Sequence, residues 1–266
     1  MTTLLYQADA FTDTPFRGNP AAVCLLDGPR EEDWMRSLAA EMNLSETAFL
    51  LPEGDGYRLR WFTPRVEVSL CGHATLASAH ILWEQGFLPT QEPARFETLS
   101  GRLTAHSLPG GWIGLDFPAQ PPSPADAPEG LLAALGVSEE QVRFVGRYKN
   151  NTLVELDREQ TVRSLTPDFE RLEQVETRAV SVTAMADDPQ LDFVSRFFAP
   201  RMGINEDPVT GSAHTALTPF WSAITGKPEL EAMQVSARGG RLRLRALGER
   251  VAIAGQAVTI FSARLA

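Results

Sequence analysis

Lysine is the residue type that this chain most clearly lacks. Among 266 residues there are only two lysines, Lys149 and Lys227. An enzyme that forms a Schiff base with its substrate or with pyridoxal phosphate needs a positioned lysine, and neither lysine lies in the repeated segments described below. The phosphate-binding patterns G-x-G-x-x-G after a strand and G-x-x-x-x-G-K-[ST] are also absent. We therefore expect an activity that uses no cofactor.

Cysteine, positive charge and long apolar runs are scarce as well. Cys24 and Cys71 are too few for a disulfide scaffold and suit a reducing cytoplasm. The formal net charge of -10 argues against a nucleic-acid partner, although a helix terminus can still bind a small anion. No run is long enough to cross a membrane, and MTTLLYQADAF lacks the pattern of a secretory signal. We expect a cytoplasmic protein with a small-molecule partner.

The sequence contains an internal repeat. Arg60-Trp-Phe-Thr-Pro-Arg65 returns as Arg196-Phe-Phe-Ala-Pro-Arg201, a shift of 136 residues (196 − 60). Gly72-His-Ala returns as Gly211-Ser-Ala, a shift of 139 (211 − 72), so the second copy has gained about three residues. Self-similarity of this kind indicates a duplicated architecture. It predicts two domains, residues 1–118 and 119–266, and the last 15 or so residues could pack back on the first domain.

Each half reads as several strands and one apolar helix. Glycines bound the two apolar runs, at Gly72 and Gly86 in the first half and at Gly211 and Gly226 in the second. Because these helices are apolar nearly all round, we expect each to be buried inside a curved sheet. The predicted fold class is therefore α+β. Further expected elements are strands at Leu4–Ala8, Ala21–Leu26 and 250–260, a turn at Gly18-Asn19-Pro20, a helix at Glu31–Glu41 and a linker at Phe117–Pro124.

The starts of the two apolar helices are candidate binding sites. Cys71 and Gly72 precede one helix, and Thr210, Gly211 and Ser212 precede or open the other. Glycine lets a ligand approach the backbone closely, and the first turn of a helix offers unpaired N–H groups to an anion. We expect the pair to bind a substrate carboxylate. The alternative is that Thr210 and Ser212 only cap a helix.

Glu46 is the candidate general base. The repeat aligns Glu46 with Val182, so only the first half carries a carboxylate at this position. Glu46 begins an apolar strand, where partial burial would make its carboxylate more basic. The competing interpretation is an exposed glutamate at a strand end.

His73 and Asp207 complete the predicted catalytic set. His73 follows a helix-opening glycine and could move a proton or bind substrate, or it could be a capping or core histidine. Asp207 precedes Pro208 and could orient another group or form a turn. Cys71 could act as a thiolate, but its repeat counterpart is Thr210, which cannot act as a base. The histidines and cysteines show no metal-ligand spacing, and we predict no metal site.

Five motifs resemble the PhzF-like family of phenazine biosynthesis: Gly18-Asn19-Pro20, Asn43-Leu-Ser-Glu46-Thr47, Phe62-Thr-Pro64, Cys71-Gly-His73-Ala-Thr and Glu206-Asp207-Pro-Val-Thr-Gly211-Ser212-Ala. The resemblance covers essentially the whole chain. It implies the diaminopimelate epimerase-like fold, in which each of two pseudo-symmetric domains wraps a curved sheet round a central helix. It also implies a homodimeric, cofactor-independent isomerase, with a glutamate at the position of Glu46 moving the proton and His73, Asp207 and Ser212 lining the pocket.

The resulting hypothesis is an isomerase that transfers a proton on a small carboxylate-bearing substrate, with Glu46 as general acid and base. One alternative is a Cys71-dependent epimerase or dehydratase acting on a small amino or imino acid. Another is a non-catalytic metabolite-binding protein.

Overall fold

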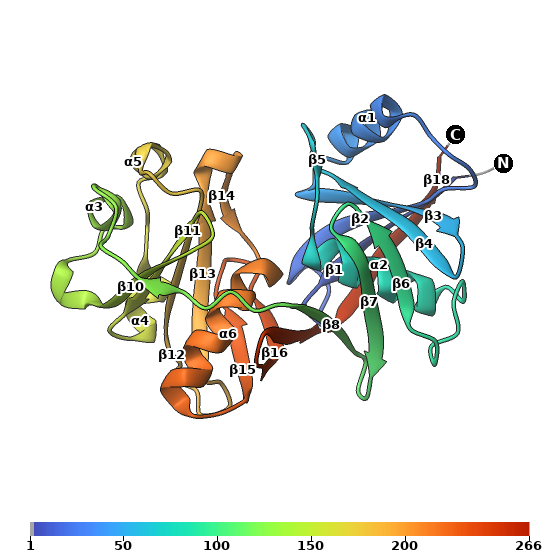
Figure 1. Ribbon diagram of the computed structural model, residues 1–266. Coiled ribbons are helices and arrows are strands. Elements are labelled where there is room, and N and C mark those ends of the chain that lie inside the picture. Colours follow the sequence, from blue (N-terminus) through green and yellow to red (C-terminus); the bar gives the residue numbers. More distant parts are fainter. Residues whose placement is uncertain (1–2, 266) are drawn as a thin grey trace. The chain divides into compact units, whose positions relative to one another are not determined.

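The computed structural model describes residues 3–265, which form two compact units (Figure 1). Unit 1 extends to Asp116 and resumes at Ile253, whereas unit 2 comprises Phe117–Ala252. The chain therefore leaves unit 1 at the start of the proline-rich stretch and returns to it near its C-terminal end. None of the helices in the described part of the chain is long and apolar enough to cross a bilayer.

Unit 1 is a mixed sheet around one central helix. Its strands follow the order β18-β1-β2-β3-β4-β6-β7-β8, antiparallel except for the parallel pairs β2–β3 and β4–β6, and β5 pairs with β4 at its end. The elements are β1 (Leu4–Ala10), β2 (Asn19–Leu25), α1 (Glu32–Met42), β3 (Glu46–Glu53), β4 (Gly56–Phe62), β5 (Glu67–Val68), α2 (Gly72–Glu84), β6 (Ala94–Thr98), β7 (Gly101–Leu108), β8 (Trp112–Pro118) and β18 (Ala257–Arg264).

The two helices of unit 1 cover opposite faces of the sheet. Helix α2 packs against β1, β2, β3, β7 and β18, and nine of its 13 residues are buried, as its apolar sequence predicts. Helix α1 is amphipathic and lays Met35 and Ala39 on the other face, beside Phe49 and Phe62. It ends at Asn43, whose φ of 50° is the left-handed conformation common at helix C-termini.

Unit 2 repeats this arrangement. Its strand order is β9-β10-β11-β12-β13-β15-β16, antiparallel except for the parallel pairs β11–β12 and β13–β15. Strand β14 pairs with β13 as β5 pairs with β4 in unit 1. The elements are β9 (Ser123–Pro124), α3 (Leu131–Leu135), η1 (Glu139–Gln141), β10 (Val142–Tyr148), β11 (Asn151–Leu156), α4 (Glu159–Ser164), α5 (Phe169–Gln174), β12 (Val180–Met185), β13 (Phe193–Ala199), η2 (Pro200–Met202), β14 (Ile204–Asp207), α6 (Gly211–Thr225), β15 (Glu229–Gln234) and β16 (Gly240–Leu247). Strand β17 (Arg250–Gly255) begins in unit 2 and ends in unit 1.

Helix α6 is the central helix of unit 2, and it tolerates an internal proline. Pro219 cannot donate the backbone hydrogen bond that would reach the carbonyl of Thr215. The backbone N–H of Gln120 donates to that carbonyl instead, at 2.9 Å. The chain that enters unit 2 therefore satisfies the acceptor that the proline leaves open.

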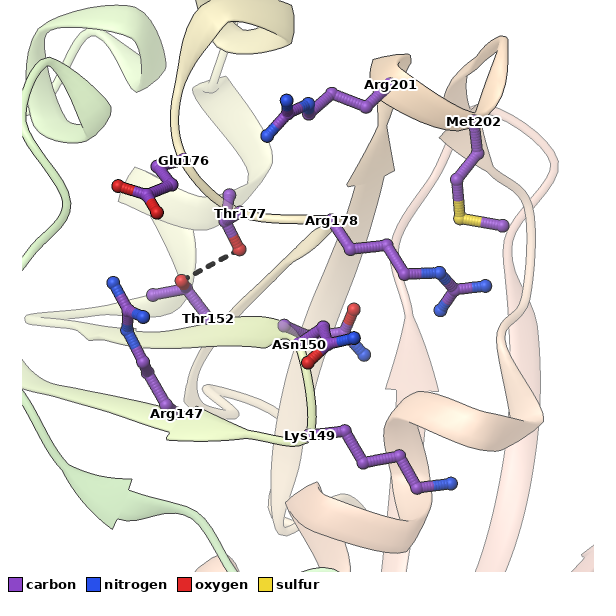
Figure 2. A pocket seen from close by; sticks show the side chains of 10 residues that line it. Arg147, Lys149, Asn150, Thr152, Glu176, Thr177, Arg178, Arg201 and Met202 are labelled. Atoms are coloured by element: carbon purple, nitrogen blue, oxygen red, sulfur yellow. Dashed lines mark hydrogen bonds between the residues drawn. The ribbon is translucent and has the colours of Figure 1, made fainter.

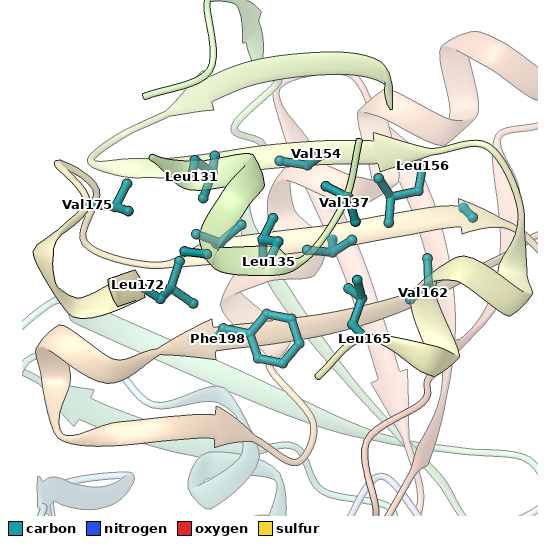
Figure 3. Packing of buried hydrophobic residues seen from close by; sticks show 14 of the residues in the cluster. Leu131, Leu135, Val137, Val154, Leu156, Val162, Leu165, Leu172, Val175 and Phe198 are labelled. Carbon is teal, nitrogen blue, oxygen red and sulfur yellow. The ribbon is translucent and has the colours of Figure 1, made fainter. Parts of the chain in front are cut away.

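Three short helices cover the other face of the unit 2 sheet. Leu131 and Leu135 of α3, Leu172 of α5 and Leu165 after α4 pack on Phe198 and on the valines of the strands (Figure 3). These side chains are almost fully buried, and each contributes roughly 1.5–3 kcal/mol relative to exposure. The sequence did not predict α3, because five residues between two glycines are too few to show a helical period.

An arginine clamp occurs once in each unit. Arg60 forms two hydrogen bonds to the carboxylate of Glu67, at 2.7 and 2.8 Å, and stacks over Phe62. Arg196 forms two to Glu206, at 2.7 and 2.9 Å, and stacks over Phe198. Paired, planar contacts of this kind are the stronger class of ion pair. The clamp explains why the Arg-x-Phe motif survives in both copies.

The strand register corrects the alignment of Glu46 with Val182. Arg60 pairs with Phe49 on β3, whereas Arg196 pairs with Val182 on β12, so Val182 corresponds to Phe49 at a shift of 133 (182 − 49). Glu46 then corresponds to Ala179 (46 shifted by 133). A slip of three residues exchanges the two faces of a strand. Val182 accordingly packs under the short helices, whereas Glu46 faces α2.

Two other local predictions were wrong. Asn19 and Pro20 are not in a turn but begin β2, and the left-handed residue before them is Gly18, with φ 64°. A Cβ on Gly18 would lie 2.1 Å from the carbonyl oxygen of Ala10, so only glycine fits there. The segment 250–260 is not one strand, because β17 ends at Gly255 and β18 begins at Ala257.

Candidate active site

The candidate site in unit 1 begins with Glu46 and His73. Glu46 is the first residue of β3, and His73 is the second residue of α2. Their side chains are 15% and 7% exposed, and Oε2 of Glu46 lies 3.4 Å from Nε2 of His73. The contact lacks the geometry of a hydrogen bond, since Nε2 of His73 makes none in the described residues. The carboxylate predicted as a base thus lies beside the predicted histidine, and both are sheltered from solvent.

Asn19 and Cys71 approach the other ring nitrogen of His73. Nδ2 of Asn19 lies 3.3 Å from Nδ1, and Sγ of Cys71 lies 3.5 Å from it. An amide nitrogen can only donate, so Nδ1 accepts and the ring proton resides on Nε2, directed to the side where Glu46 lies. Burial lowers the pKa of His73 to about 4, although the nearby carboxylate favours the charged ring. We therefore assign His73 as a neutral imidazole at pH 7.

Strand pairing explains why these residues meet. Strands β2 and β3 run parallel with Ala21 opposite Glu46, so the start of β2 carries Asn19 to the same end of the sheet. Helix α2 begins at this end, and no side chain caps it at Cys71. The sequence does not mark Asn19 as a site residue, because Gly-Asn-Pro is typical of a turn. Its complete burial in a strand is the signal that only the structure supplies.

The ligand atoms of Glu46, Cys71 and His73 all lie within 4.8 Å of one another, close enough to be considered as a metal site. The contacts, however, involve both nitrogens of one ring: the thiol is next to Nδ1 and the carboxylate is next to Nε2. A single ion takes only one imidazole nitrogen. The histidine therefore links the thiol and the carboxylate through contacts on its two ring nitrogens.

In unit 2, the equivalent helix start is held by a glutamine. The backbone N–H of Thr210 donates to Oε1 of Gln234 at 2.8 Å, and Nε2 of Gln234 donates to the carbonyl of Asp207 at 2.7 Å. The hydroxyl of Thr210 donates to the carboxylate of Asp207. The loop before α6 is therefore fixed by three side chains. Gln234 was missed from sequence because it lies 24 residues beyond Thr210, on β15.

Neighbouring residues in the first turn of α6 differ in their exposure to solvent. Gly211 is buried and Ser212 is exposed, and the Thr210 side chain does not cap the helix. The alternative interpretation of Thr210 as a simple helix cap is therefore wrong. The hydroxyl of Thr210 is engaged with Asp207, which leaves the first-turn N–H groups without a cap from that side chain.

His214 lies one turn further along α6 and is structural. Its Nδ1 donates to the carbonyl of Thr210 at 2.8 Å, and its ring stacks on Phe193 with 5.9 Å between centroids. Burial lowers the pKa of His214 to about 4. His214 is thus a core histidine that fixes the start of α6.

The profile of the PhzC-PhzF family, described as phenazine biosynthesis-like protein, matches residues 8–263. An uncharacterised isomerase of Halalkalibacterium halodurans is 51% identical over 100% of this chain and 99% of its own length. An uncharacterised isomerase of Pseudomonas aeruginosa is 48% identical over the same shares.

A solved structure agrees over the whole chain. The crystal structure of a phenazine biosynthesis protein of the PhzF family from Enterococcus faecalis has 40% sequence identity and a TM-score of 0.94, and covers 100% of both chains. This agreement confirms the predicted α+β, diaminopimelate epimerase-like fold. The chain belongs to the PhzC-PhzF family of phenazine biosynthesis-like proteins.

Proposed function

We propose that this protein is an isomerase that transfers a proton on a small carboxylate-bearing substrate without a cofactor. The observation that carries the proposal is the position of Glu46, 15% exposed at a strand end and 3.4 Å from Nε2 of a neutral histidine. Relatives about 50% identical over the full length carry the name isomerase, which supports the reaction class.

Glu46 is the group that carries the proton in this proposal. His73 has its pKa lowered to about 4, so at pH 7 it is neutral and can donate from Nε2 but holds no spare proton. Asn19 fixes that tautomer by donating to Nδ1. His73 therefore orients Glu46 or the substrate, and the carboxylate removes and returns the proton.

The starts of the central helices supply the anion-binding part of the proposal. Gly72 opens α2 immediately beside His73, and Gly211 and Ser212 open α6. Backbone N–H groups at a helix start can hold a substrate carboxylate and stabilise an enolate-like anion, an effect commonly worth about 3 kcal/mol per donor. We assign Asp207 and Thr210 to positioning this second helix start, because the Thr210 hydroxyl donates to the Asp207 carboxylate, and Nε2 of Gln234 donates to the Asp207 backbone carbonyl and to the Thr210 hydroxyl.

A second candidate function has one specific observation in its favour. Sγ of Cys71 lies 3.5 Å from Nδ1 of His73, and an imidazole next to a thiol is a common way to activate it. A Cys71-dependent epimerase or dehydratase would use this pair. The third possibility, a binding protein without catalysis, predicts that no bound acid exchanges a hydrogen with solvent.

The test is hydrogen exchange from deuterated water into a panel of carboxylic acids, followed by NMR or mass spectrometry. We expect Glu46→Gln to lower the exchange rate by roughly 10²–10⁴-fold while ligand binding is retained. Glu53→Gln is the matched control, because Glu53 ends the same strand, is exposed and should leave the rate unchanged.

The outcomes separate the candidates. Full exchange in Glu46→Gln would remove the central assignment. Loss of exchange in Cys71→Ser, together with full exchange in Glu46→Gln, would establish the thiol mechanism instead. If the wild-type protein binds an acid but never labels it, the catalytic proposals both fail.

A further inference from the structure

A hollow of about 510 Å³ on unit 2 is lined by an unusual set of charges (Figure 2). Four cations surround it, Arg147, Lys149, Arg178 and Arg201, against one carboxylate, Glu176. Its size falls within the range of small-molecule sites. All of its lining residues belong to unit 2, whereas Glu46 and His73 belong to unit 1.

The cations at this pocket are not neutralised. In the described residues 3–265, none of the four forms an ion pair, and the only recorded hydrogen bond from their side chains is from Arg201 to the carbonyl of Val175. By contrast, Arg60 and Arg196 are each clamped by a carboxylate. Gathering uncompensated like charges costs free energy through repulsion, and a bound anion relieves that cost.

Lys149 occupies its place against its conformational preference. It is the first of two residues between β10 and β11, and its φ is 48°. This left-handed conformation at a hairpin turn normally selects glycine or asparagine. A strained backbone that persists is a reason to look for a function of the side chain. In Figure 2 the side chains of Lys149 and Arg178 extend from neighbouring loops at this pocket.

The pocket also contains polar groups at its inner wall. Asn151 is 8% exposed, and its Oδ1 has no hydrogen-bond partner in the described residues. The hydroxyl of Thr152 donates to that of Thr177 at 3.0 Å, which in turn donates to the carbonyl of Ala179. The unpaired Oδ1 of Asn151 is an acceptor, so the cationic side chains, and not this atom, would hold an oxyanion.

The pocket lies at the end of the unit 2 sheet that corresponds to the Glu46 end of the unit 1 sheet. Glu46 begins β3 in unit 1, and the strand register makes its counterpart in unit 2 Ala179, which directly follows Arg178. Unit 1 therefore has a carboxylate at this strand end, where unit 2 has cations. The same end of the repeated sheet therefore carries negative charge in unit 1 and positive charge in unit 2.

We propose that this pocket is a binding site for a small dianionic oxyanion, such as the phosphate group of a phosphomonoester or a dicarboxylate. An arginine guanidinium can form two parallel hydrogen bonds to either a phosphate or a carboxylate. The pocket has a local excess of three positive charges (four cations against one carboxylate), which favours a dianion over a monoanion. The chain's net charge of -10 does not prevent an anion from binding here, because salt largely screens charges that lie more than about 10 Å away.

The test is isothermal titration calorimetry of the intact protein at low ionic strength, with inorganic phosphate and with succinate as separate probes. We expect saturable binding of at least one probe, weakened by added salt. Arg178→Gln and Lys149→Gln should each weaken it roughly tenfold, since each removes a charged donor. Glu176→Gln should tighten it, because it removes the only carboxylate of the pocket.

Two controls make the outcome decisive. Arg143→Gln removes an exposed cation on β10 that does not line the pocket, and it should leave binding unchanged. Glu46→Gln should also leave binding unchanged, so the proposal survives or fails separately from the proposed catalysis. It is overturned if neither probe saturates, if Arg143→Gln weakens binding as much as Arg178→Gln, or if Glu46→Gln abolishes it. Binding of phosphate alone or succinate alone supports the site and identifies which oxyanion it takes.

Discussion

The buried histidine of unit 2 should make the fold sensitive to mild acid. His214 has its pKa lowered by burial from 6.5 to about 4, so the folded protein resists protonation that the unfolded chain accepts. The contribution of this residue is fully present above pH 6.5 and is lost as the pH falls from 6.5 towards 4. Between pH 7.5 and 5.0, the difference in protonation amounts to about 2 kcal/mol of unfolding free energy.

The structure explains why protonation is unfavourable at this position. Nδ1 of His214 already donates to the carbonyl of Thr210, so the added proton must go on Nε2. Nε2 is buried and has no partner in the described residues. The ring also stacks on Phe193, which offers no counter-charge. A charged imidazole here would have one hydrogen bond and no ion pair.

The assay is urea unfolding at pH 7.5 and at pH 5.0 for the wild type and for His214→Gln, whose amide can still donate to Thr210. We expect the wild type to lose about 2 kcal/mol more than the variant between these pH values. His106→Gln is the control, because His106 is exposed and its removal should leave the pH dependence of the wild type unaltered. If His214→Gln and the wild type lose the same free energy, His214 is not held neutral by burial and the reasoning fails.

Two further substitutions test the turn and the clamp. Lys149→Gly should stabilise the fold by about 1 kcal/mol, because glycine adopts φ 48° without strain, and thermal unfolding should show a midpoint raised by about 2–4 °C. A lowered midpoint would mean that Lys149 is not strained. Glu206→Gln should cost about 3 kcal/mol in a urea titration, since it leaves the nearly buried guanidinium of Arg196 without its carboxylate. The matched change Glu53→Gln breaks the exposed pair with Arg58 and should cost no more than about 0.5 kcal/mol; equal losses would contradict the role of burial.

The sequence predicted the elements that have strong local signals. The two central helices begin where expected, at Gly72 and Gly211, because an apolar run opened by glycine is distinct from the alternating strands around it. The repeat predicted that both halves share one architecture, and the strand orders confirm it. Helix α3 and the short strand β14 escaped prediction, since four or five residues carry too little periodicity.

The site was harder to predict because it depends on register and on distant contacts. Aligning Glu46 with Val182 gave a useful asymmetry but the wrong partner, since a match between short motifs ignores the alternation of side chains along a strand. Asn19 and Gln234 reach the site from separate strands, where no local pattern marks them. The basic pocket escaped notice because its cations are spread from residue 147 to residue 201.

The pairing of β1 with β18 has a consequence for biosynthesis. Leu4 lies opposite Arg264, so β1 takes its neighbour from a strand that is synthesised only after the whole of unit 2. Unit 2 is one continuous segment and can fold while translation proceeds, whereas the sheet of unit 1 must wait with an open edge. A truncated product would therefore expose β1, and a chaperone that shields strand edges would act on the older half of the nascent chain.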